Sequence, residues 1–256
     1  MTNPLVLESS LLRALGVHHG FSTRHGGVSA GALATLNLSI APGDDPANVA
    51  ENLRRLSAAI GVAPSRLFQA SQVHGGSARE IDGSDLREAV VREEHDALIA
   101  RQRGDAVGVR VADCVPVLLF DEASGHVAAA HAGWRGVAGG VISAAVAQLC
   151  RFAPPRALVA AIGPCIGACC FEVGDEVVAA IDDAAPGDAS LARPGPTGRP
   201  HVDLRLAVRR QLRALGVDDA RIEDVGGCTR CDAETYFSFR RDGALSGRHL
   251  GAIAAR

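Results

Sequence analysis

The sequence contains no lysine, and all 26 of its basic residues are arginine. Without a lysine ε-amine, the chain cannot form a lysine Schiff base, attach pyridoxal phosphate or supply the lysine of a P-loop. Any bound anion must therefore be held by arginine, by backbone N–H groups or by a metal ion. Arginine can clamp a phosphate with two hydrogen bonds, but it stays protonated and cannot act as a general base.

Excess charge and long apolar runs are also missing. The 26 basic and 29 acidic side chains give a net charge of −3, which offers no basic field to nucleic acid or to an anionic membrane. No stretch approaches the roughly 20 apolar residues of a spanning helix, and residues 1–17 do not resemble a signal peptide. We therefore expect a cytoplasmic protein.

The seven cysteines are unevenly spaced and fit reduced thiols better than a disulfide framework.

The chain alternates between strand and helix patterns around a core that its 47% hydrophobic content predicts. Residues 43–61 predict a helix, with Asp45 as its cap and Gly61 at its end. No repeat or composition break appears, so the sequence predicts a single α/β domain over residues 1–256. The further expected elements are strands at about 96–100, 107–120 and 126–131, a helix over 133–152, a strand within 157–167, a helix over 174–185, a Pro/Gly-rich loop over 186–201 and a helix over 202–216.

Three polar side chains stand within apolar or glycine-rich segments: His74 in "SQVHGG", Cys114 in "RVADCVPVLLF" and His131 in "VAAAHAGWRG". We expect His74 on a strand, Cys114 just before a buried strand and His131 at the end of the next one. Imidazole and thiolate together suit zinc or copper. Three protein ligands leave a position open for water or substrate, which favours catalysis over a structural role. Simple core packing is the alternative for each residue alone.

Four further residues are candidates for the chemistry around such a metal. Asp113, beside Cys114, can orient a ligand or accept a proton, although a turn carboxylate is an equal alternative. Arg24 in "STRHGGVSAG" accompanies a glycine-rich loop that offers N–H groups to an anion, but a solvated arginine in a tight turn is the simpler interpretation. Arg135 in "HAGWRG" lies near a predicted helix start, and Arg240 in "YFSFRRDG" follows an aromatic run.

The remaining cysteines form no clear motif. Cys228 and Cys231 have CxxC spacing, and Cys165, Cys169 and Cys170 lie upstream. Together they can form a second zinc or iron–sulfur site. A redox CxxC motif needs a helix N-terminus, and none is evident here. We therefore expect structural packing for these cysteines.

The segments carrying these residues closely resemble the YfiH family, also called the polyphenol oxidase or laccase-domain family. The resemblance runs nearly end to end, and "ADC" with "HAGWRG" is specific to this family. It implies a layered α-β sandwich with the sheets between helices. It also implies that the His of "QVHG", the Cys of "ADC" and the His of "HAGWRG" bind a catalytic metal, generally zinc. Those positions are His74, Cys114 and His131.

The resemblance also implies an activity, the phosphorolysis of adenosine, inosine and methylthioadenosine to free base and ribose 1-phosphate, with adenosine deamination beside it. Purine nucleosides and phosphate are then the partners of a monomer or small homo-oligomer. Arg24 and Arg240 are the candidate phosphate ligands, and Asn37 in "LNL" is a candidate contact to ribose or phosphate. The family commonly has Asn–Arg where this chain has Asn52–Leu53, so Arg54 or Arg55 must substitute if that arginine binds an anion.

Two other functions remain open. Cys114 can act as the nucleophile of a cysteine amidase, with His131 as its base, because some family members resemble enzymes that edit peptidoglycan precursors. A copper polyphenol oxidase, or laccase, is the second alternative. Such oxidases need several His-x-His pairs to bind a three-copper cluster, and none of the nine histidines forms such a pair. Zinc is therefore the expected metal, with copper as the alternative.

Overall fold

The computed structural model describes residues 4–39, 43–151 and 154–256. Two large sheets and a hairpin make up its strands. One sheet has the order β1-β2-β13-β6-β3, and the other has the order β12-β9-β7-β8-β5-β4. The strands of the first sheet are β1 (Val6–Leu7), β2 (His19–Ser22), β13 (His249–Ala254), β6 (Ala106–Val111) and β3 (Leu67–Phe68). Those of the second are β12 (Ile222–Asp224), β9 (Leu158–Ile162), β7 (Val115–Asp121), β8 (Val127–Ala132), β5 (Ala97–Ala100) and β4 (Ala78–Ile81).

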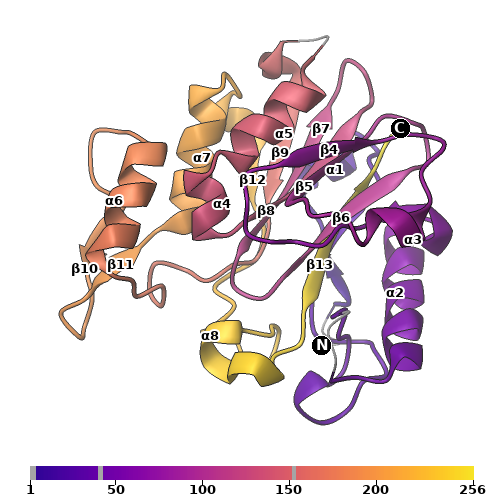
Figure 1. Ribbon diagram of the computed structural model, residues 1–256, viewed down its shortest axis with the longest axis horizontal. Coiled ribbons are helices and arrows are strands. Elements are labelled where there is room, and N and C mark those ends of the chain that lie inside the picture. Colours follow the sequence, from indigo (N-terminus) through magenta and orange to yellow (C-terminus); the bar gives the residue numbers. More distant parts are fainter. Residues whose placement is uncertain (1–3, 40–42, 152–153) are drawn as a thin grey trace.

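Helices cover the outer faces of both sheets, as Figure 1 shows. Helix α2 (Pro46–Ile60) packs on the first sheet, and α4 (Trp134–Ala138), α5 (Val141–Leu149), α6 (Asp175–Ala184) and α7 (Leu204–Ala214) gather on the second. The remaining α-helices are α1 (Ser10–Ala14), α3 (Arg87–Val90) and α8 (Phe239–Asp242). The expected layered α-β sandwich, with sheets between helices, is confirmed.

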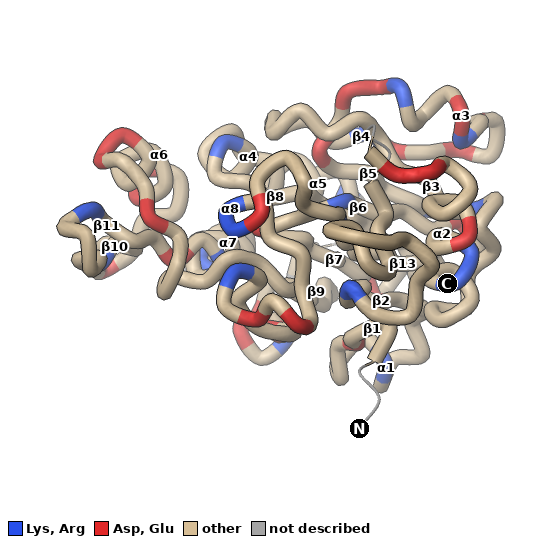
Figure 2. Tube along the Cα trace, turned by 90° about the horizontal axis from the view of Figure 1, so that it is seen from below, with Lys and Arg blue, Asp and Glu red and all other residues tan. Residues whose placement is uncertain are grey.

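Alternation along β7 explains why its sequence is apolar throughout. Val117 and Leu119 pack in the cluster shared with the helices, whereas Leu118 and Phe120 pack between the two sheets. A strand buried on both faces has no polar face to show. Charged residues lie instead mainly on the helices and connecting loops (Figure 2). No helix in the part of the chain that the structure describes is long and apolar enough to cross a membrane.

The helix predicted over 43–61 is confirmed as α2. The side chain of Asp45 accepts a hydrogen bond from the Ala47 N–H at 2.8 Å, which caps the first turn. Gly61 ends the helix in the left-handed region, at φ 76°, where glycine avoids the strain of a side chain. The helix predicted over 202–216 is likewise confirmed as α7, which begins after its cap Asp203.

Three predicted elements are wrong in detail. The strand expected over 107–120 is two strands, β6 and β7, separated at residues 112–114. The helix expected over 133–152 is interrupted between α4 and α5, and residue 152 lies outside the described residues. The loop expected over 186–201 contains most of a hairpin, in which β10 (Ala192–Pro194) pairs with β11 (Pro200–Val202). Glycine and proline spacing marked the turns of this segment but concealed its short strands.

Candidate functional site

The structure brings His74, Cys114 and His131 together, with their candidate ligand atoms all within 4.8 Å of one another. The sheet accounts for two of these positions. β7 and β8 are antiparallel neighbours in which Val115 lies opposite Ala132, so Cys114 just before β7 faces the end of β8, where His131 lies. The His74 and His131 rings meet edge to face, with centroids 4.8 Å apart. His131 is buried, Cys114 is half-buried and His74 is exposed, so the group opens toward solvent on one side.

The expectation that His74 lies on a strand is wrong. It lies in a loop between β3 and β4, with φ at 60°. The buried carboxylate of Asp96 fixes this loop by accepting hydrogen bonds from the backbone N–H groups of Gly75 (2.6 Å), His74 (3.0 Å) and Val73 (3.2 Å). Three bonds to one carboxylate can hold a backbone conformation that is otherwise unfavourable for a non-glycine residue.

Asp96 also orients His131. Its Oδ1 accepts a hydrogen bond from His131 Nδ1 at 2.7 Å, which leaves Nε2 of the ring free to bind a metal. A carboxylate in this position fixes the tautomer and makes the imidazole a better ligand. Sequence reasoning missed Asp96. Its only signal was an acidic residue placed directly before the buried strand β5.

The electrostatics of the group favour a thiolate. Burial raises the pKa of the Cys114 thiol, but the charge of His131 and hydrogen bonds from both histidines outweigh it and lower the pKa to about 6. Burial lowers the pKa of His131, but Cys114 and Asp96 outweigh it and raise the pKa to about 9. Thiolate is the form that binds metal, and a bound cation would take the place of the His131 proton.

Gly133 leaves the space that the three side chains surround. A Cβ atom at this position would lie 3.0 Å from Cys114 Sγ and 3.0 Å from His74 Cδ2. These distances are shorter than ordinary van der Waals contacts. The glycine of "HAGWRG" therefore permits the close approach of two candidate ligands.

The group lies at the wall of a cavity of about 580 Å³, a size typical of small-molecule sites. Half of the fourteen other lining residues are arginine or aromatic. Of the described residues, those lining it are Ser39, Ser71, Gln72, His74, Arg110, Val111, Ala112, Asp113, Cys114, His131, Trp134, Arg135, Ile166, Phe171, Phe239, Arg240 and Arg248.

Arg110 and Arg248 give the cavity an unbalanced positive charge. Burial, together with the charge of Arg248, lowers the pKa of Arg110 to about 10. Arg110 donates to Gln69 Oε1 and the Ala70 carbonyl, both at 2.7 Å, and Arg248 donates to the carbonyls of Ser246 and Gly247. Neither forms an ion pair with any residue that the structure describes. Asp113, which lines the same cavity, acts on Arg248 through its charge. Two guanidinium groups that form no ion pair within the described residues still favour an anion.

Aromatic rings accompany the arginines of this cavity. Arg135 lies over Trp134 (4.5 Å from guanidinium carbon to ring centroid), Arg240 over Phe171 (5.4 Å) and Arg248 over Phe239 (5.5 Å). Phe239 is 51% exposed, so much of its surface remains available to a ligand. The site therefore combines faces for a flat ring with cations for an anion.

Asp113 is fully engaged by protein groups. Its Oδ1 accepts from Thr229 Oγ1 and its Oδ2 from the Arg240 N–H, both at 2.6 Å. With φ at 86° it forms the break between β6 and β7. These contacts hold Thr229 and helix α8 against the cavity, whereas a role in proton transfer stays a prediction.

Arg24 and Asn37 lie outside the cavity lining. Arg24 donates to the carbonyls of Ala34 (2.9 Å) and Ala233 (2.8 Å) and lies over Phe237. Asn37 is buried, and its Oδ1 accepts from the backbone N–H groups of Ser39 and Arg248, both at 3.0 Å. Asn37 thus positions two cavity residues without lining the cavity itself.

Helix α2 does not supply a substitute arginine to the cavity. Arg54 and Arg55 both donate to the carboxylate of Glu51, at 2.7 and 2.8 Å. Neither lines the cavity. Leu53 packs against the core that α2 shares with the first sheet.

The other cysteines separate into two kinds. Cys165 is buried in the main core, as expected for structural packing. Cys169, Cys170, Cys228 and Cys231 instead form a second group of candidate metal ligands. Cys228 begins a turn and not a helix, as expected. Cys170 and Cys228 also pack in or against the main core, in line with that expectation, whereas Cys169 and Cys231 are exposed.

The donor set fits one mononuclear metal at His74, Cys114 and His131, with a position left open. It does not fit a multinuclear copper oxidase centre, because such a centre needs several histidine pairs. Within the described residues, the only other group of three or more candidate ligands is the four-cysteine group, which contains no histidine.

Comparisons with known proteins agree with the fold. Residues 18–256 match the family model described as multi-copper polyphenol oxidoreductase laccase. "Purine nucleoside phosphorylase SCO2081" of Streptomyces coelicolor is 42% identical over 239 residues, 93% of this chain and 95% of that protein. "Adenosine deaminase RL5", from an unknown prokaryotic organism, is 40% identical over 243 residues, 91% of this chain and 92% of that protein. The crystal structure of YlmD from Geobacillus stearothermophilus superposes with a TM-score of 0.89 at 34% identity, covering 97% of this chain and 94% of that one.

Proposed function

The chain belongs to the family described as multi-copper polyphenol oxidoreductase laccase, and we propose that it is a metal-dependent purine nucleoside phosphorylase. One observation carries this proposal: a single cavity holds the three candidate metal ligands, three aromatic rings and arginines that lack ion-pair partners among the described residues. A nucleoside needs ring faces for its base, and phosphate needs cations. The relatives named purine nucleoside phosphorylase support the same conclusion.

In the proposed reaction, a phosphate oxygen forms a bond to C1′ of the ribose. The bond from C1′ to the purine nitrogen breaks, and its electron pair leaves with the base, which takes up the proton that hydrogen phosphate loses overall. Arg248 and Arg110 would hold the phosphate, with Arg240 and Arg135 near the same wall. Holding both reactants in one cavity makes the attack effectively unimolecular.

The purine base would stack on the exposed face of Phe239 or on Trp134. Asn37 contributes indirectly, because it fixes the backbone of Arg248. Arg24 fixes the backbone at Ala34 and Ala233. Because Arg248 and Arg110 line the cavity and Arg24 does not, we assign phosphate binding to Arg248 and Arg110 ahead of Arg24.

His74, Cys114 and His131 would hold a zinc ion, with copper as the alternative. When bound, such an ion supplies Lewis-acid polarisation of an oxygen or activation of a water molecule. The Asp96 carboxylate binds His131 Nδ1, so the Nε2 atom on the other side of the ring remains available as a metal ligand. Adenosine deamination, the activity named in one relative, is the proposed accessory reaction of the same site.

Incubating the purified protein with adenosine, with and without inorganic phosphate, tests the proposal by chromatography. We expect adenine and ribose 1-phosphate only when phosphate is present, and inosine in both conditions. Absence of base release would contradict the proposal, and release without phosphate would identify a hydrolase instead.

The cysteine amidase remains the second candidate, because Cys114 and His131 lie side by side. The lowered pKa of Cys114 favours a thiolate, and the raised pKa of His131 favours an imidazolium. That function requires a metal-free thiol. It predicts that a dipeptide-like precursor protects Cys114 from alkylation while adenosine does not. Protection by adenosine together with a stoichiometric metal would exclude it.

A further inference from the structure

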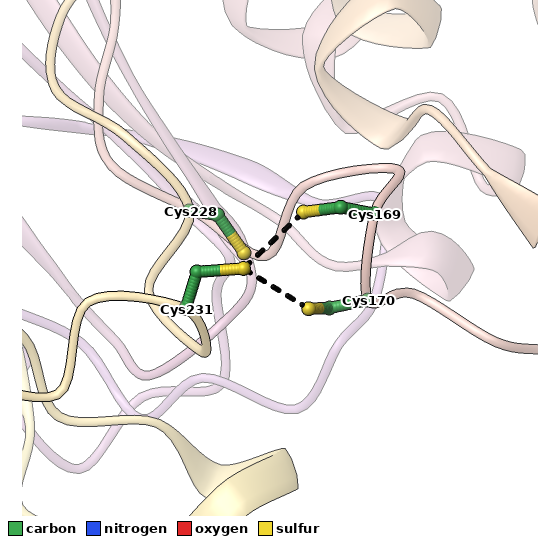
Figure 3. A group of neighbouring side chains, drawn as sticks. All are labelled: Cys169, Cys170, Cys228 and Cys231. Atoms are coloured by element: carbon green, nitrogen blue, oxygen red, sulfur yellow. Dashed lines mark hydrogen bonds between the residues drawn. The ribbon is translucent and has the colours of Figure 1, made fainter.

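Four cysteines meet outside the cavity, as Figure 3 shows. Cys169 and Cys170 lie on the loop between β9 and α6, and Cys228 and Cys231 lie on the loop between β12 and α8. Their sulfur atoms all lie within 4.8 Å of one another. Cys231 Sγ is 3.5 Å from Cys169 Sγ and 3.3 Å from Cys170 Sγ. The proposed phosphorylase chemistry uses none of them.

We propose that these four cysteines bind a structural zinc ion. A tetrahedral zinc with Zn–S bonds of about 2.3 Å holds its four sulfur atoms about 3.8 Å apart. The two closest separations, 3.5 and 3.3 Å, lie slightly below that value, and no pair is more than 4.8 Å apart. An iron–sulfur cluster binds its cysteines through different iron atoms and spreads the sulfurs more widely than one ion does. The compact arrangement therefore favours a single ion, and four thiolates give the closed coordination of a structural site.

Neighbouring groups suit the charge of such a site. Four thiolates and one Zn²⁺ carry a net charge of about −2. The backbone N–H of Gly167 donates to Cys228 Sγ at 3.2 Å, and the guanidinium of Arg230 interacts with the Cys170 thiol. Hydrogen bonds and nearby cations of this kind stabilise metal-bound thiolates. Gly167 also leaves room for the group, because a Cβ there would lie 3.2 Å from Cys169 Sγ.

Core packing explains only part of the arrangement, because Cys170 and Cys228 pack in or against the main core but their two partners do not. Cys169 and Cys231 are exposed, and all four thiols are free cysteines. Buried apolar surroundings are the usual reason for a structural cysteine, and those two residues lack them. The 3.3 and 3.5 Å contacts are also well beyond a disulfide bond of about 2.05 Å.

A zinc ion here would fasten two loops that form one wall of the cavity. Thr229, inside the CxxC turn, donates to Asp113, the neighbour of Cys114, at 2.6 Å. Phe171, which follows Cys170, lines the cavity beneath Arg240. The proposed ion is therefore separate from the catalytic one and would support the cavity from outside.

Zinc analysis of proteins purified without chelator tests the proposal independently of any activity on nucleosides. We expect about two zinc ions per chain in the wild type and about one in the Cys169→Ser/Cys231→Ser variant. His74→Ala should also retain about one, and the combined variant should retain almost none. Cys150→Ser is the matched control, because Cys150 lies at the end of α5 and outside both groups. Equal zinc content in the wild type and the double-serine variant would overturn the proposal.

Two measurements guard against a variant that fails to fold. The single variant Cys169→Ser changes only an exposed thiol and should lose the same ion. In the wild type, alkylation followed by mass spectrometry should find Cys169, Cys170, Cys228 and Cys231 protected until a chelator is added, while labelling of Cys150 does not respond to the chelator. Labelling of the four cysteines that is equally fast with and without chelator, or a disulfide among them, would overturn the proposal.

Discussion

The two groups of candidate metal ligands occupy different kinds of structure. His131 and Cys114 stand at the ends of paired strands, so the sheet fixes their separation with or without a metal. The four cysteines stand on two loops, and two of them are exposed. Three ligands leave a position open, whereas four close the coordination sphere. Two strand ends, together with the His74 loop that Asp96 holds, thus favour a preformed catalytic group. The two cysteine loops favour a group that the metal itself would hold together.

The largest effect should come from removing a ligand of the first group. We expect His74→Ala to lower kcat/KM for adenosine phosphorolysis by about 10³-fold or more, because a bound metal contributes several kcal/mol to the transition state. His18→Ala, outside the cavity, is the control. Parallel kinetics and zinc analysis check the result. Near-normal turnover in His74→Ala would remove the metal from the proposed reaction.

The second-largest effect should come from removing Asp96, the carboxylate that orients the metal ligand His131. Asp96→Asn should weaken zinc binding at the first group by about 10- to 100-fold, because the carboxylate that orients His131 is lost. Competition with a coloured chelator measures the affinity. Zinc at the four cysteines should not change, and Asp82→Asn in an exposed turn is the control. A uniform loss of both ions would indicate general unfolding instead.

Phosphate binding should separate Arg248 from Arg24. Arg248→Gln should raise the KM for phosphate about 10-fold or more, because a hydrogen bond to a charged group contributes about 1.5–3 kcal/mol. Deamination of adenosine, which uses no phosphate, should be little affected. Arg24→Gln should leave the KM for phosphate unchanged, because Arg24 does not line the cavity. A raised KM for phosphate in Arg24→Gln, with an unchanged KM in Arg248→Gln, would identify Arg24 as the phosphate ligand instead.

The smallest effect is expected for the four-cysteine group. In the His74→Ala background, adding Cys169→Ser should lower the melting temperature by a few degrees, at about 2–4 °C for each kcal/mol lost. A chelator should lower the melting temperature of His74→Ala by a similar amount and leave the double variant unchanged. Calorimetry measures both shifts. If the chelator does not change the melting temperature of His74→Ala, the two cysteine loops do not depend on a metal for their stability.

The local parts of the fold were predictable from the sequence. Asp45 and Gly61 mark the ends of α2 because caps act over a few neighbouring residues. The break between β6 and β7 was not predictable in this way. Val107 to Phe120 is an almost unbroken apolar run, and the left-handed Asp113 inside it depends on contacts with Thr229 and Arg240. Thr229 lies 116 positions after Asp113 in the sequence and Arg240 lies 127 positions after it, so contacts between distant residues set that turn.

The candidate site was predictable in its ligands but not in its surroundings. The three ligands have unusual chemistry for their apolar or glycine-rich segments, so they stand out in the sequence. Asp96 and Arg248 are ordinary polar residues beside strands, and Arg110 lies within β6. Antiparallel pairing of β13 with β6 places His249 opposite Val111 and so brings Arg248 to the cavity that Arg110 lines. Only the pairing of distant strands reveals this.

Gly133 offers protein engineers a way to separate ligand chemistry from available volume. A single methyl group at this position would reach Cys114 and His74 at 3.0 Å while leaving every donor atom in the chain. The Gly133→Ala variant therefore narrows the space between the ligands by steric hindrance alone. It does not alter charge, hydrogen bonding or the number of ligands. Its metal preference would report how tightly the protein, as distinct from its donor atoms, selects an ion by size.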